Sequence, residues 1–320
     1  MTWLLTGASG FIGTRLASNL HRKGIRLRLS SCTVPTQPYP AFAGIEWIPT
    51  ADLQPSTDWG DALRGVEVIV HLAARVHVMR ETVADPWRSF SQVNVGGTLG
   101  LARQAAEAGV RRLVFMSTVK VHGERTRPGQ PFVETCRQAP YDAYAQSKAD
   151  AEHALFSLAE RTGLEVVVVR SPLVYGAGVK GNFQRLIQLI RAGYPLPLGA
   201  VHNLRSLVAL DNLVDFLQLC GTHPVAAGQC FLISDDADLS TPDLIRQIAS
   251  ALGRATRLVS VPAPILALAA QLLGHQQALS RLTDHLQVDI HKARTLLGWR
   301  PVVSVAQGIA DAVRGLGSPR

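Results

Sequence analysis

The sequence predicts an α/β protein in which a parallel sheet is covered by helices on both faces. A glycine-rich turn follows an apolar run near the start of the chain, and short apolar runs then alternate with helical stretches up to about the middle. Strands that alternate with helices imply parallel strands, because each return to the same edge of the sheet requires a crossover connection. The expected fold class is a doubly wound parallel sheet with a smaller, interleaved C-terminal lobe.

The first element is a strand at residues 3–5, followed by Gly7, Gly10 and Gly13 and by a helical stretch at 14–21. A strand, a glycine turn and a helix N-terminus form a cradle for a pyrophosphate, because glycine lets the backbone approach the phosphates and the helix N–H groups neutralise them. The spacing is Gly-x-x-Gly-x-x-Gly, and such a turn also occurs without a ligand. A second motif is needed to decide whether this turn binds a cofactor.

The remaining elements follow the same alternation. The run Glu165-Val-Val-Val-Val-Arg170 is β-branched and uninterrupted, as in a strand buried on both faces. The last third is rich in Pro and Gly, and its helical pieces are rich in Leu. Strands are expected at 25–29, 67–72, 112–116 and 164–169, with helices at 95–108, 145–159, 242–252 and 264–273.

The second motif is Tyr144-Ala-Gln-Ser-Lys148. Residues four apart lie on one face of a helix, about one turn from each other. A phenol with a pKa of about 10 is not a phenolate at neutral pH, but an adjacent ammonium and a positively charged nicotinamide would stabilise the phenolate. The pair then predicts proton transfer to or from an alcohol or a ketone. A surface helix can carry both residues by chance, and the upstream glycine turn argues against that interpretation.

Further short motifs extend along the chain in a characteristic order. They are Thr6-Gly-Ala-Ser-Gly-Phe-Ile-Gly13, His71-Leu-Ala-Ala74, Asn94-Val-Gly-Gly-Thr98, Phe115-Met-Ser-Thr118, Arg170-Ser-Pro-Leu-Val-Tyr-Gly176, Arg205-Ser-Leu-Val-Ala-Leu-Asp211 and Leu296-Leu-Gly-Trp-Arg-Pro301. With Tyr144 and Lys148, the chain resembles, essentially end to end, the extended short-chain dehydrogenase/reductases that act on nucleotide sugars, the UDP-glucose 4-epimerase-like group.

The resemblance implies how the chain is divided. We expect a Rossmann dinucleotide-binding domain at 1–172, with returns near 207–233, and a nucleotide-sugar-binding lobe at 173–206 and 234–320. Members of the family often dimerise through a four-helix contact, and we carry a homodimer as an expectation.

The resemblance also implies a nicotinamide cofactor. Asn94 would hold the backbone near it or would simply be a helix N-cap, and Asp52 would accept the adenine amino group or would only cap a turn. The implied cofactor-binding residues are Gly7, Ser9, Gly10, Phe11, Ile12, Gly13, Ser30, Ser31, Asp52, Leu53, Leu72, Ala73, Ala74, Asn94, Tyr144 and Lys148.

The end of the second strand bears on which cofactor is used. Relatives that prefer NAD place an acid there to bind the ribose 2′-hydroxyl. Residues 26–31 read Arg-Leu-Arg-Leu-Ser-Ser and carry no acid. Ser30, Ser31 and the nearby arginines could instead accept a 2′-phosphate, so NADP(H) is somewhat favoured over NAD(H).

The segment after the fifth strand bears on the reaction. Thr118 matches the family position that hydrogen-bonds the reacting sugar oxygen, and Thr118, Tyr144 and Lys148 are the expected catalytic residues. Relatives that eliminate water carry an Asp-Glu pair next, where this chain has Val119-Lys120. Redox at C4 of a UDP-sugar remains, as a 4-epimerase or a 4-ketoreductase. The missing second-strand acid and residues 119–124, which resemble bacterial O-antigen enzymes reducing UDP-4-keto-6-deoxy-N-acetylhexosamines, favour the reductase.

The expected substrate-binding residues rest on fewer matches to the family's motifs. Asn182, Arg205 and Arg281 are expected to contact the nucleotide-sugar diphosphate, with Arg205 as a phosphate fork. Arg75 and His77 could face the sugar, although positions on the surface are the plainer expectation. A nucleotide-sensing regulator or an interaction scaffold on the same fold are the non-enzymatic alternatives, and the retention of Tyr144 and Lys148 argues against both.

Charge and cysteine content limit the partners. The net charge of +8 suggests an anionic partner, but Lys and Arg are dispersed, so we expect a dinucleotide and a UDP-sugar rather than nucleic acid. The apolar run within 262–274 is too short to span a bilayer, and we expect a packed helix of the lobe. No metal-ligand spacing is seen at Cys32, Cys136, Cys220 and Cys230, so we expect no metal and reduced thiols. The cofactor strand begins at once, so we expect no signal peptide and a cytoplasmic location.

Overall fold

A parallel sheet forms the centre of the molecule. The computed structural model describes residues 1–32, 45–50, 52–76, 85–274 and 276–316. In this part of the chain seven strands pair in the order β3-β2-β1-β4-β5-β6-β9, and the predicted doubly wound parallel sheet is confirmed. The strands are β1 (Thr2–Thr6), β2 (Arg26–Ser31), β3 (Glu46–Pro49), β4 (Val68–His71), β5 (Arg112–Thr118), β6 (Glu165–Ser171) and β9 (Cys230–Leu232).

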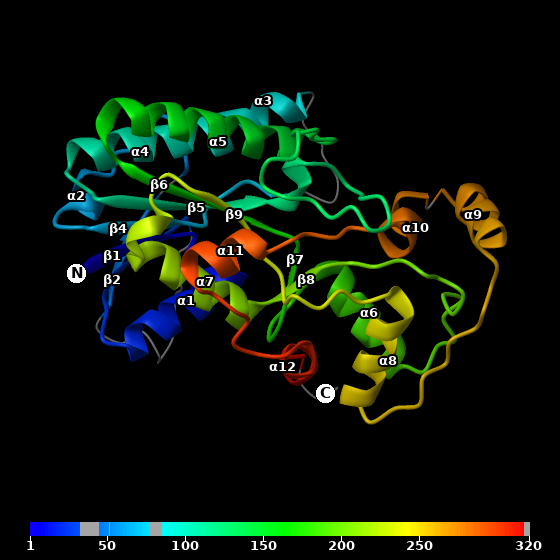
Figure 1. Cartoon of the computed structure of the whole chain (residues 1–320). Coiled ribbons are helices and arrows are strands. Elements are labelled where there is room, and N and C mark those ends of the chain that lie inside the picture. The colour runs from blue at the N-terminus through cyan, green and yellow to red at the C-terminus, as the bar shows by residue number, and fades with distance from the viewer. Residues whose placement is uncertain (33–44, 51, 77–84, 275, 317–320) are drawn as a thin grey trace.

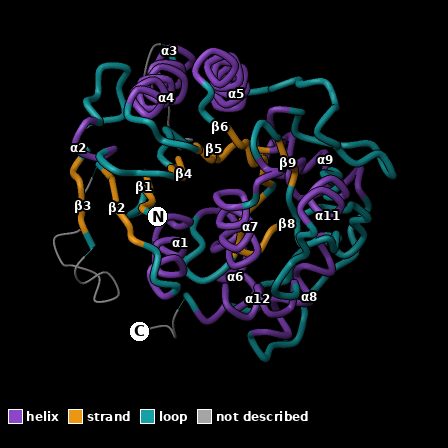
Figure 2. The backbone as a smooth tube through the Cα atoms, turned by 60° about the vertical axis from the view of Figure 1, so that its left-hand side comes forward, coloured by secondary structure: helices purple, strands orange, loops and turns teal. Residues whose placement is uncertain are grey.

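Helices cover both faces of this sheet (Figures 1 and 2). Alternate residues of β1 show why: Trp3 and Leu5 join the core under one helix layer, and Leu4 joins the core under the other. One layer contains α1 (Phe11–Arg22) and α7 (Leu210–Thr222), and the other contains α2 (Gly60–Leu63), α3 (Pro86–Phe90), α4 (Thr98–Glu107) and α5 (Ala143–Thr162).

The lobe has its own core at the other end of the molecule. Phe183, Ile187, Ile248 and Ile309 are among the side chains buried there. The elements are a small parallel sheet of β7 (Leu173–Tyr175) and β8 (Leu207–Ala209), and the helices α6 (Gly181–Arg191), α8 (Thr241–Ala251), α9 (Ala263–Leu272), α10 (Gln276–Thr283) and α12 (Val305–Arg314).

The chain returns to the sheet domain after α10. Leu286, Val288 and the residues around α11 (His291–Leu297) pack in the core cluster between the sheet and α1 and α7. Trp299 donates from Nε1 to Asp215 at 3.0 Å. This segment lies in the range assigned to the lobe, yet it fills the core of the sheet domain. The division at residue 234 stays a prediction, and residues 286–299 are where it conflicts with the packing.

Helix α9 is less packed than expected. Of its described residues, Leu266 and Ala270 are buried, and most of the others are exposed. None of the described helices combines the length and the apolar character that crossing a membrane requires.

Candidate active site

At two of the three glycines in the glycine turn, neighbouring backbone atoms leave no room for a side chain. Gly7 has φ +67°, and a Cβ there would lie 2.8 Å from the nitrogen of Ala73. A Cβ at Gly13 would lie 2.7 Å from the Cα of Ala8. At Gly10 the nearest atom to such a Cβ is the carbonyl oxygen of Gly7, at 3.1 Å. Gly10 therefore leaves the N-terminus of α1 open to an approaching group.

The start of α1 fits a pyrophosphate. No side chain caps the helix at Gly10, so the N–H groups of its first turn are not satisfied by a cap. Free N–H groups at a helix N-terminus attract phosphate. Ser9, Phe11 and Ile12 are partly buried around this turn. Phe11 also packs against the cores of both the sheet domain and the lobe.

Asn94 joins the loop after β4 to α5. Its Oδ1 accepts from the nitrogen of Arg75 at 2.8 Å, and its Nδ2 donates to the carbonyl oxygen of Arg75 and to Ser147 Oγ, both at 3.0 Å. Asn94 lies inside a π-helix, Ser91–Gly97, that precedes α4, so it is not a helix N-cap. It holds the backbone of the partly buried loop that contains Leu72, Ala73 and Ala74.

The buried imidazole of His71 lies within hydrogen-bond distance of two threonines on neighbouring elements. The sequence analysis assigned no role to this residue. Its Nδ1 lies 2.7 Å from Thr6 Oγ1 and its Nε2 lies 2.9 Å from Thr98 Oγ1, so it links β1, β4 and α4. Burial and, to a lesser degree, the charge of Lys148 lower its pKa to about 3, and the ring is neutral at physiological pH. The His71-Leu-Ala-Ala74 motif was the signal that could have pointed to it.

The Tyr144 and Lys148 pair lies on α5, as predicted. Asp142 caps this helix by accepting from the nitrogen of Ala145 at 2.7 Å. Burial and then the charge of Asp142 raise the pKa of Tyr144 to about 12, so the protein without a cofactor holds a neutral phenol. Burial, opposed by the charge of Glu152, lowers the pKa of Lys148 to about 7. The phenolate that the motif predicts therefore depends on an additional positive charge.

A buried ion pair lies one turn beyond Lys148. Glu152 accepts from the guanidinium of Arg170 on β6, with the shortest contact at 2.6 Å, and both side chains are almost fully buried. Glu152 also accepts from Ser117, and Arg170 Nη1 lies 2.8 Å from His122 Nε2. Sequence reasoning missed this pair, although Arg170 opens one of the quoted motifs.

Thr118 lies at the end of β5, beside the start of α5. Its Oγ1 accepts from the nitrogen of Lys120 at 3.3 Å. The Nζ of Lys120 in turn contacts Asp142 at 2.9 Å and Glu124 at 3.7 Å. Val119 is buried. The structure thus ties the turn that carries Thr118 to the helix that carries Tyr144 and Lys148.

Two of the side chains expected to accept a 2′-phosphate at β2 are engaged with other residues. Ser30 and Ser31 are buried, and the Ser30 hydroxyl bonds Thr50. Arg28 is engaged with Glu46 at 2.8 Å and with backbone carbonyls near α2. Ser30 and Arg28 are thus engaged within the protein, and the lean toward NADP(H) stays a prediction.

The two residues expected near the adenine differ in exposure. Asp52 is exposed, and its carbonyl oxygen accepts from Thr57 Oγ1 at 2.6 Å. Leu53 is buried, and its backbone lies so close to Gly97 that a Cβ at Gly97 would be 2.7 Å from the Leu53 carbonyl oxygen.

The residues expected to hold the diphosphate lie in the lobe. Arg205 donates to the carbonyl oxygen of Asp284 at 3.0 Å. Burial and, to a lesser degree, the charge of Arg281 lower the pKa of Arg205, so the two guanidinium groups are electrostatic neighbours. Arg281 itself is exposed on α10, and Asn182 is exposed at the start of α6.

Arg75 and His77 are the two residues that we considered for a contact with the sugar. Arg75 is partly buried, with its guanidinium 5.5 Å from the centre of the Phe90 ring. His77 lies outside the described residues.

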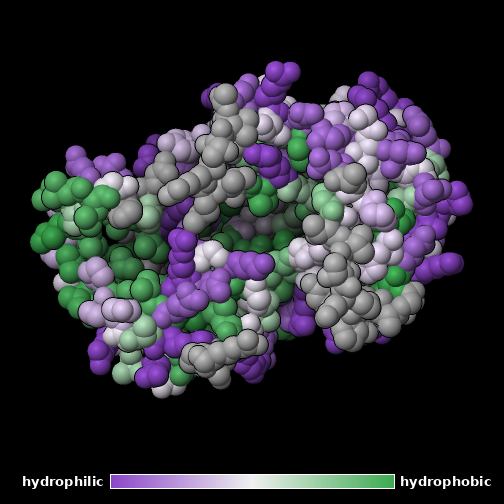
Figure 3. All heavy atoms as spheres, turned by 180° about the vertical axis from the view of Figure 1, so that it is seen from behind, coloured by the Kyte–Doolittle hydropathy of each residue, from purple (hydrophilic) through white to green (hydrophobic). Residues whose placement is uncertain are grey.

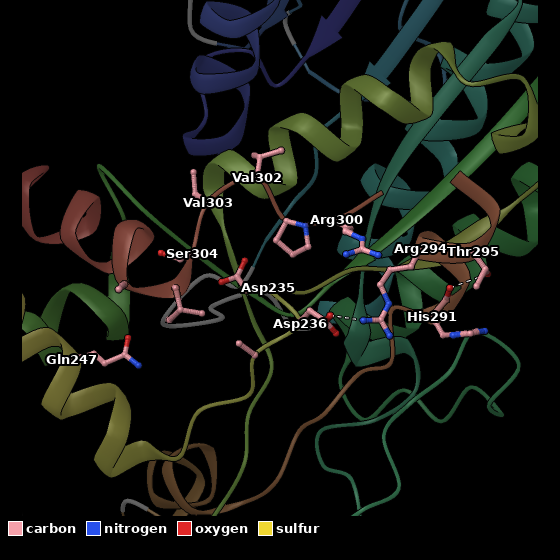
Figure 4. A pocket seen from close by; sticks show the side chains of 14 residues that line it. Asp235, Asp236, Gln247, His291, Arg294, Thr295, Arg300, Val302, Val303 and Ser304 are labelled. Carbon is pink, nitrogen blue, oxygen red and sulfur yellow. Dashed lines mark hydrogen bonds and ion pairs between the residues drawn. The ribbon is translucent and has the colours of Figure 1, made fainter. Parts of the chain in front are cut away.

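A cleft of about 890 Å³ opens away from these residues, between α8, α11 and the segment that leads to α12 (Figure 4). An ion pair between Arg294 and Asp236, at 2.5 Å, lies along its wall. Asp235 accepts there from Tyr175, the nitrogen of Ala209 and Asn212, each at 2.7 Å. None of the predicted site residues lines this cleft.

Comparisons with known proteins identify the family of this chain. The family model of the NAD dependent epimerase/dehydratase family matches residues 3–233. A UDP-glucose 4-epimerase of Vibrio cholerae is 40% identical over 312 residues, covering 97% of this chain and 94% of the relative. An N-acetyl-alpha-D-glucosaminyl-diphospho-ditrans,octacis-undecaprenol 4-epimerase of Escherichia coli O157:H7 is 26% identical over 269 residues, covering 82% of this chain and 76% of the relative.

Solved structures show the same fold. The UDP-glucose 4-epimerase of Thermus thermophilus in complex with NAD superposes with a TM-score of 0.77 at 24% identity, covering 100% of both chains. The UDP-glucuronic acid 4-epimerase of Bacillus cereus in complex with NAD has a TM-score of 0.78 at 20% identity, covering 99% of this chain and 98% of the other. From the extent of the family match and the relative at 40% identity, the chain belongs to the NAD dependent epimerase/dehydratase family.

Proposed function

We propose that the protein catalyses NAD(P)-dependent oxidoreduction at C4 of a UDP-sugar. The observation that supports the proposal is that Asn94 bonds the backbone of Arg75, in the loop that packs against Gly7, and also Ser147, on the helix that carries Tyr144 and Lys148. In doubly wound sheets, ligands bind at the carboxyl ends of the strands, where β4 and β5 end here. When bound at the turn, the nicotinamide cofactor would supply or accept the hydride.

The proton at the C4 oxygen would be moved by Tyr144. Its pKa of about 12 keeps the phenol protonated at neutral pH, ready to donate its proton to the oxygen when a C4 ketone is reduced. In an epimerisation the C4 alcohol would first be oxidised, and there the phenolate would take up the hydroxyl proton. Lys148, with a pKa of about 7, supplies a positive charge that would stabilise the phenolate left behind. Thr118 would hydrogen-bond the same sugar oxygen and fix its position.

The contacts of Val119 and Lys120 argue against elimination of water. Val119 is buried and apolar, and Lys120 is held by Asp142 and Glu124. Neither side chain can exchange a proton as an Asp-Glu pair does. The chemistry that remains either inverts the alcohol at C4 or reduces a ketone at C4 to an alcohol.

Two forms of C4 chemistry are supported by different observations. A 4-epimerase is supported by the Vibrio cholerae and Escherichia coli relatives, both of which are 4-epimerases. A 4-ketoreductase acting on a UDP-4-keto-6-deoxy-(N-acetyl)hexose in polysaccharide synthesis is supported by the absence of an acid at the end of β2. The epimerase is the better supported of the two.

On the substrate side, Arg205 and Arg281 would bind the diphosphate. Two neighbouring guanidinium groups suit a doubly charged phosphate ester, since each can donate two parallel hydrogen bonds. Asn182, exposed at the start of α6, would complete the polar contacts.

The test is incubation of the purified protein with UDP-glucose or UDP-N-acetylglucosamine without added coenzyme. Formation of the C4 epimer, with NAD released on denaturation, supports the epimerase. Oxidation of added NAD(P)H only with a UDP-4-keto-6-deoxy sugar supports the reductase instead. A 4-keto-6-deoxy product from the UDP-hexose would refute both, and inactivity toward every UDP-sugar while coenzyme still binds would refute the substrate class.

A further inference from the structure

Lys120 lies in the short turn that follows β5 and contacts the start of α5. Its backbone nitrogen donates to Thr118 Oγ1 at 3.3 Å, so the turn closes onto the proposed catalytic threonine. Its Nζ donates to Asp142 Oδ2 at 2.9 Å. The other oxygen of Asp142 accepts from the nitrogen of Ala145 and caps the helix. One carboxylate therefore connects the turn that carries Thr118 to the first turn of α5.

Asp142 lies two residues before Tyr144, and its negative charge opposes formation of a phenolate. Burial and then the charge of Asp142 raise the pKa of Tyr144. The ammonium of Lys120 places the opposite charge against this carboxylate. The side chains of the pair are 26% exposed for Lys120 and 20% exposed for Asp142, so solvent screens their charges incompletely. Lys120 therefore offsets a charge that disfavours proton donation by Tyr144.

Charged residues on other elements around the start of α5 complete the surroundings of Tyr144. They are Lys148 on the same helix, the pair of Glu152, on α5, with Arg170, on β6, Glu124 beyond the turn, Arg75 in the loop after β4 and Arg88 on α3. The pair has no net charge, and Arg88 is exposed. The π-helix Ser91–Gly97 and the first turn of α4 carry no charged residue. Because Lys148 also lies on the helix, a change at Lys120 should adjust the pKa of Tyr144 without removing its proton-transfer role.

This site lies away from the hydrophobic surface of the lobe. Seen from behind, hydrophobic residues gather at the left edge of Figure 3, at the end of the molecule where Figure 1 shows α9 and α10. Helix α5 instead packs against α3 and against the turn that carries Lys120. A change at Lys120 is therefore expected to act on the surroundings of Tyr144 and not on that surface.

We propose that Lys120 is a positioning residue of the proton-transfer site, which acts through Asp142. Its ion pair holds the turn that carries Thr118 against α5, and its charge neutralises the carboxylate beside Tyr144. The inference rests on the proton-transfer role that the proposed function gives to Tyr144. Lys120 bears on the reaction without exchanging a proton itself. A pair with only a structural role would leave the ionisation of Tyr144 unchanged, and this difference makes the inference testable.

The experiment follows the ionisation of Tyr144 in the full-length protein saturated with NAD⁺. The ultraviolet absorbance of phenolate is titrated against pH, and the curve of the Tyr144→Phe protein is subtracted. Lys120→Met should move the midpoint to higher pH by about one unit, because it leaves the charge of Asp142 unopposed. Lys120→Arg keeps the charge and should stay near the parent. Asp142→Asn keeps a capping oxygen and should move the midpoint to lower pH, and in that background Lys120→Met should have a much smaller effect.

The matched control is Lys23→Met, which removes an exposed ammonium after α1, where Nζ donates to Gln218 at 2.7 Å on the opposite face of the sheet. It should leave the midpoint unchanged, and thermal melting should show that all variants remain folded. An unchanged midpoint in folded Lys120→Met protein, or an equal shift in Lys23→Met, overturns the inference even if the parent turns over a UDP-sugar. A parent that turns over no UDP-sugar, while the midpoint of Tyr144 shifts as expected, would refute the proposed reaction and leave the role of Lys120 standing. With an active parent, the limb of the pH profile of kcat that belongs to Tyr144 should shift in the same direction in Lys120→Met, with KM little changed.

Discussion

The Nζ atom of Lys148 lies 3.8 Å from the centre of the Phe115 ring, so the expected catalytic lysine sits over an aromatic face on β5. A ring face attracts a cation, whereas burial disfavours one. Burial is the stronger effect here, and the pKa of Lys148 falls to about 7. The positive charge on this lysine is therefore easily gained or lost near neutral pH, which is where a proton-transfer site works.

Replacing Tyr144 by Phe should remove proton transfer and keep the packing of the ring against Phe90. We expect kcat to fall by about 10²–10⁴, with little change in coenzyme affinity. Lys148→Met should be similarly slow and should also weaken coenzyme binding. Steady-state kinetics and calorimetric titration measure the two effects, and a Tyr144→Phe enzyme within about threefold of the parent would exclude the role.

Gly10→Val should abolish coenzyme binding and leave the fold intact. Gly10 has φ −76° and ψ 172°, an extended conformation that any residue adopts, and its side is open apart from the Gly7 carbonyl oxygen. Gly13→Val is the contrasting variant. A Cβ there lies within 2.7 Å of Ala8, so this variant should lose about 3 kcal/mol of folding stability by overpacking. Unchanged coenzyme affinity in a folded Gly10→Val protein would contradict the phosphate cradle.

Acid should destabilise the protein through His71. Its pKa is about 3 when folded, against about 6.5 for an unfolded histidine, so only the unfolded chain takes up a proton between these values. Stability is therefore present above pH 6.5 and is lost as the pH falls toward 3. Between pH 7 and pH 5 this amounts to about 2 kcal/mol. Urea unfolding at both pH values measures it, and His71→Gln should show a smaller difference between them.

Breaking the buried ion pair should be costly. Glu152→Gln leaves the guanidinium of Arg170 buried without its counter-charge, and we expect a loss of about 3–5 kcal/mol. The control is Asp61→Asn, which breaks an exposed pair with Arg64 and should change stability by less than about 1 kcal/mol. Equal melting temperatures for Glu152→Gln and the control would show that the buried pair contributes no net stability.

Much of the sheet could be predicted from the sequence, because each strand is marked by the residue types of its own short segment. The β-branched run at 165–170 became β6, and the glycine turn became the entry to α1. The helix expected at 95–108 begins earlier, with the π-helix Ser91–Gly97. Hydrophobic spacing at 3.6 residues per turn does not reveal the extra residue of a π-helix.

Contacts between distant residues were not predictable in the same way. Glu152 and Arg170 look like surface charges in the sequence, since their pairing depends on how α5 packs on β6. From the sequence, the Ser30 hydroxyl could bind a phosphate. In the structure it bonds Thr50, which directly follows the neighbouring strand β3. In both cases the tertiary partner, and not the residue type, decides what the side chain can do.

The packing of Trp299 on Phe216, with ring centres 4.9 Å apart, bears on how the protein matures during synthesis. Domains generally fold as units as they leave the ribosome. Here Ile290, Leu297 and Trp299 belong to the core of the sheet domain, although they are translated well after its strands. The N-terminal strands and helices must therefore remain with an incompletely covered apolar face until residues 290–299 have emerged, and a nascent chain that ends near residue 233 would keep that face exposed to chaperones.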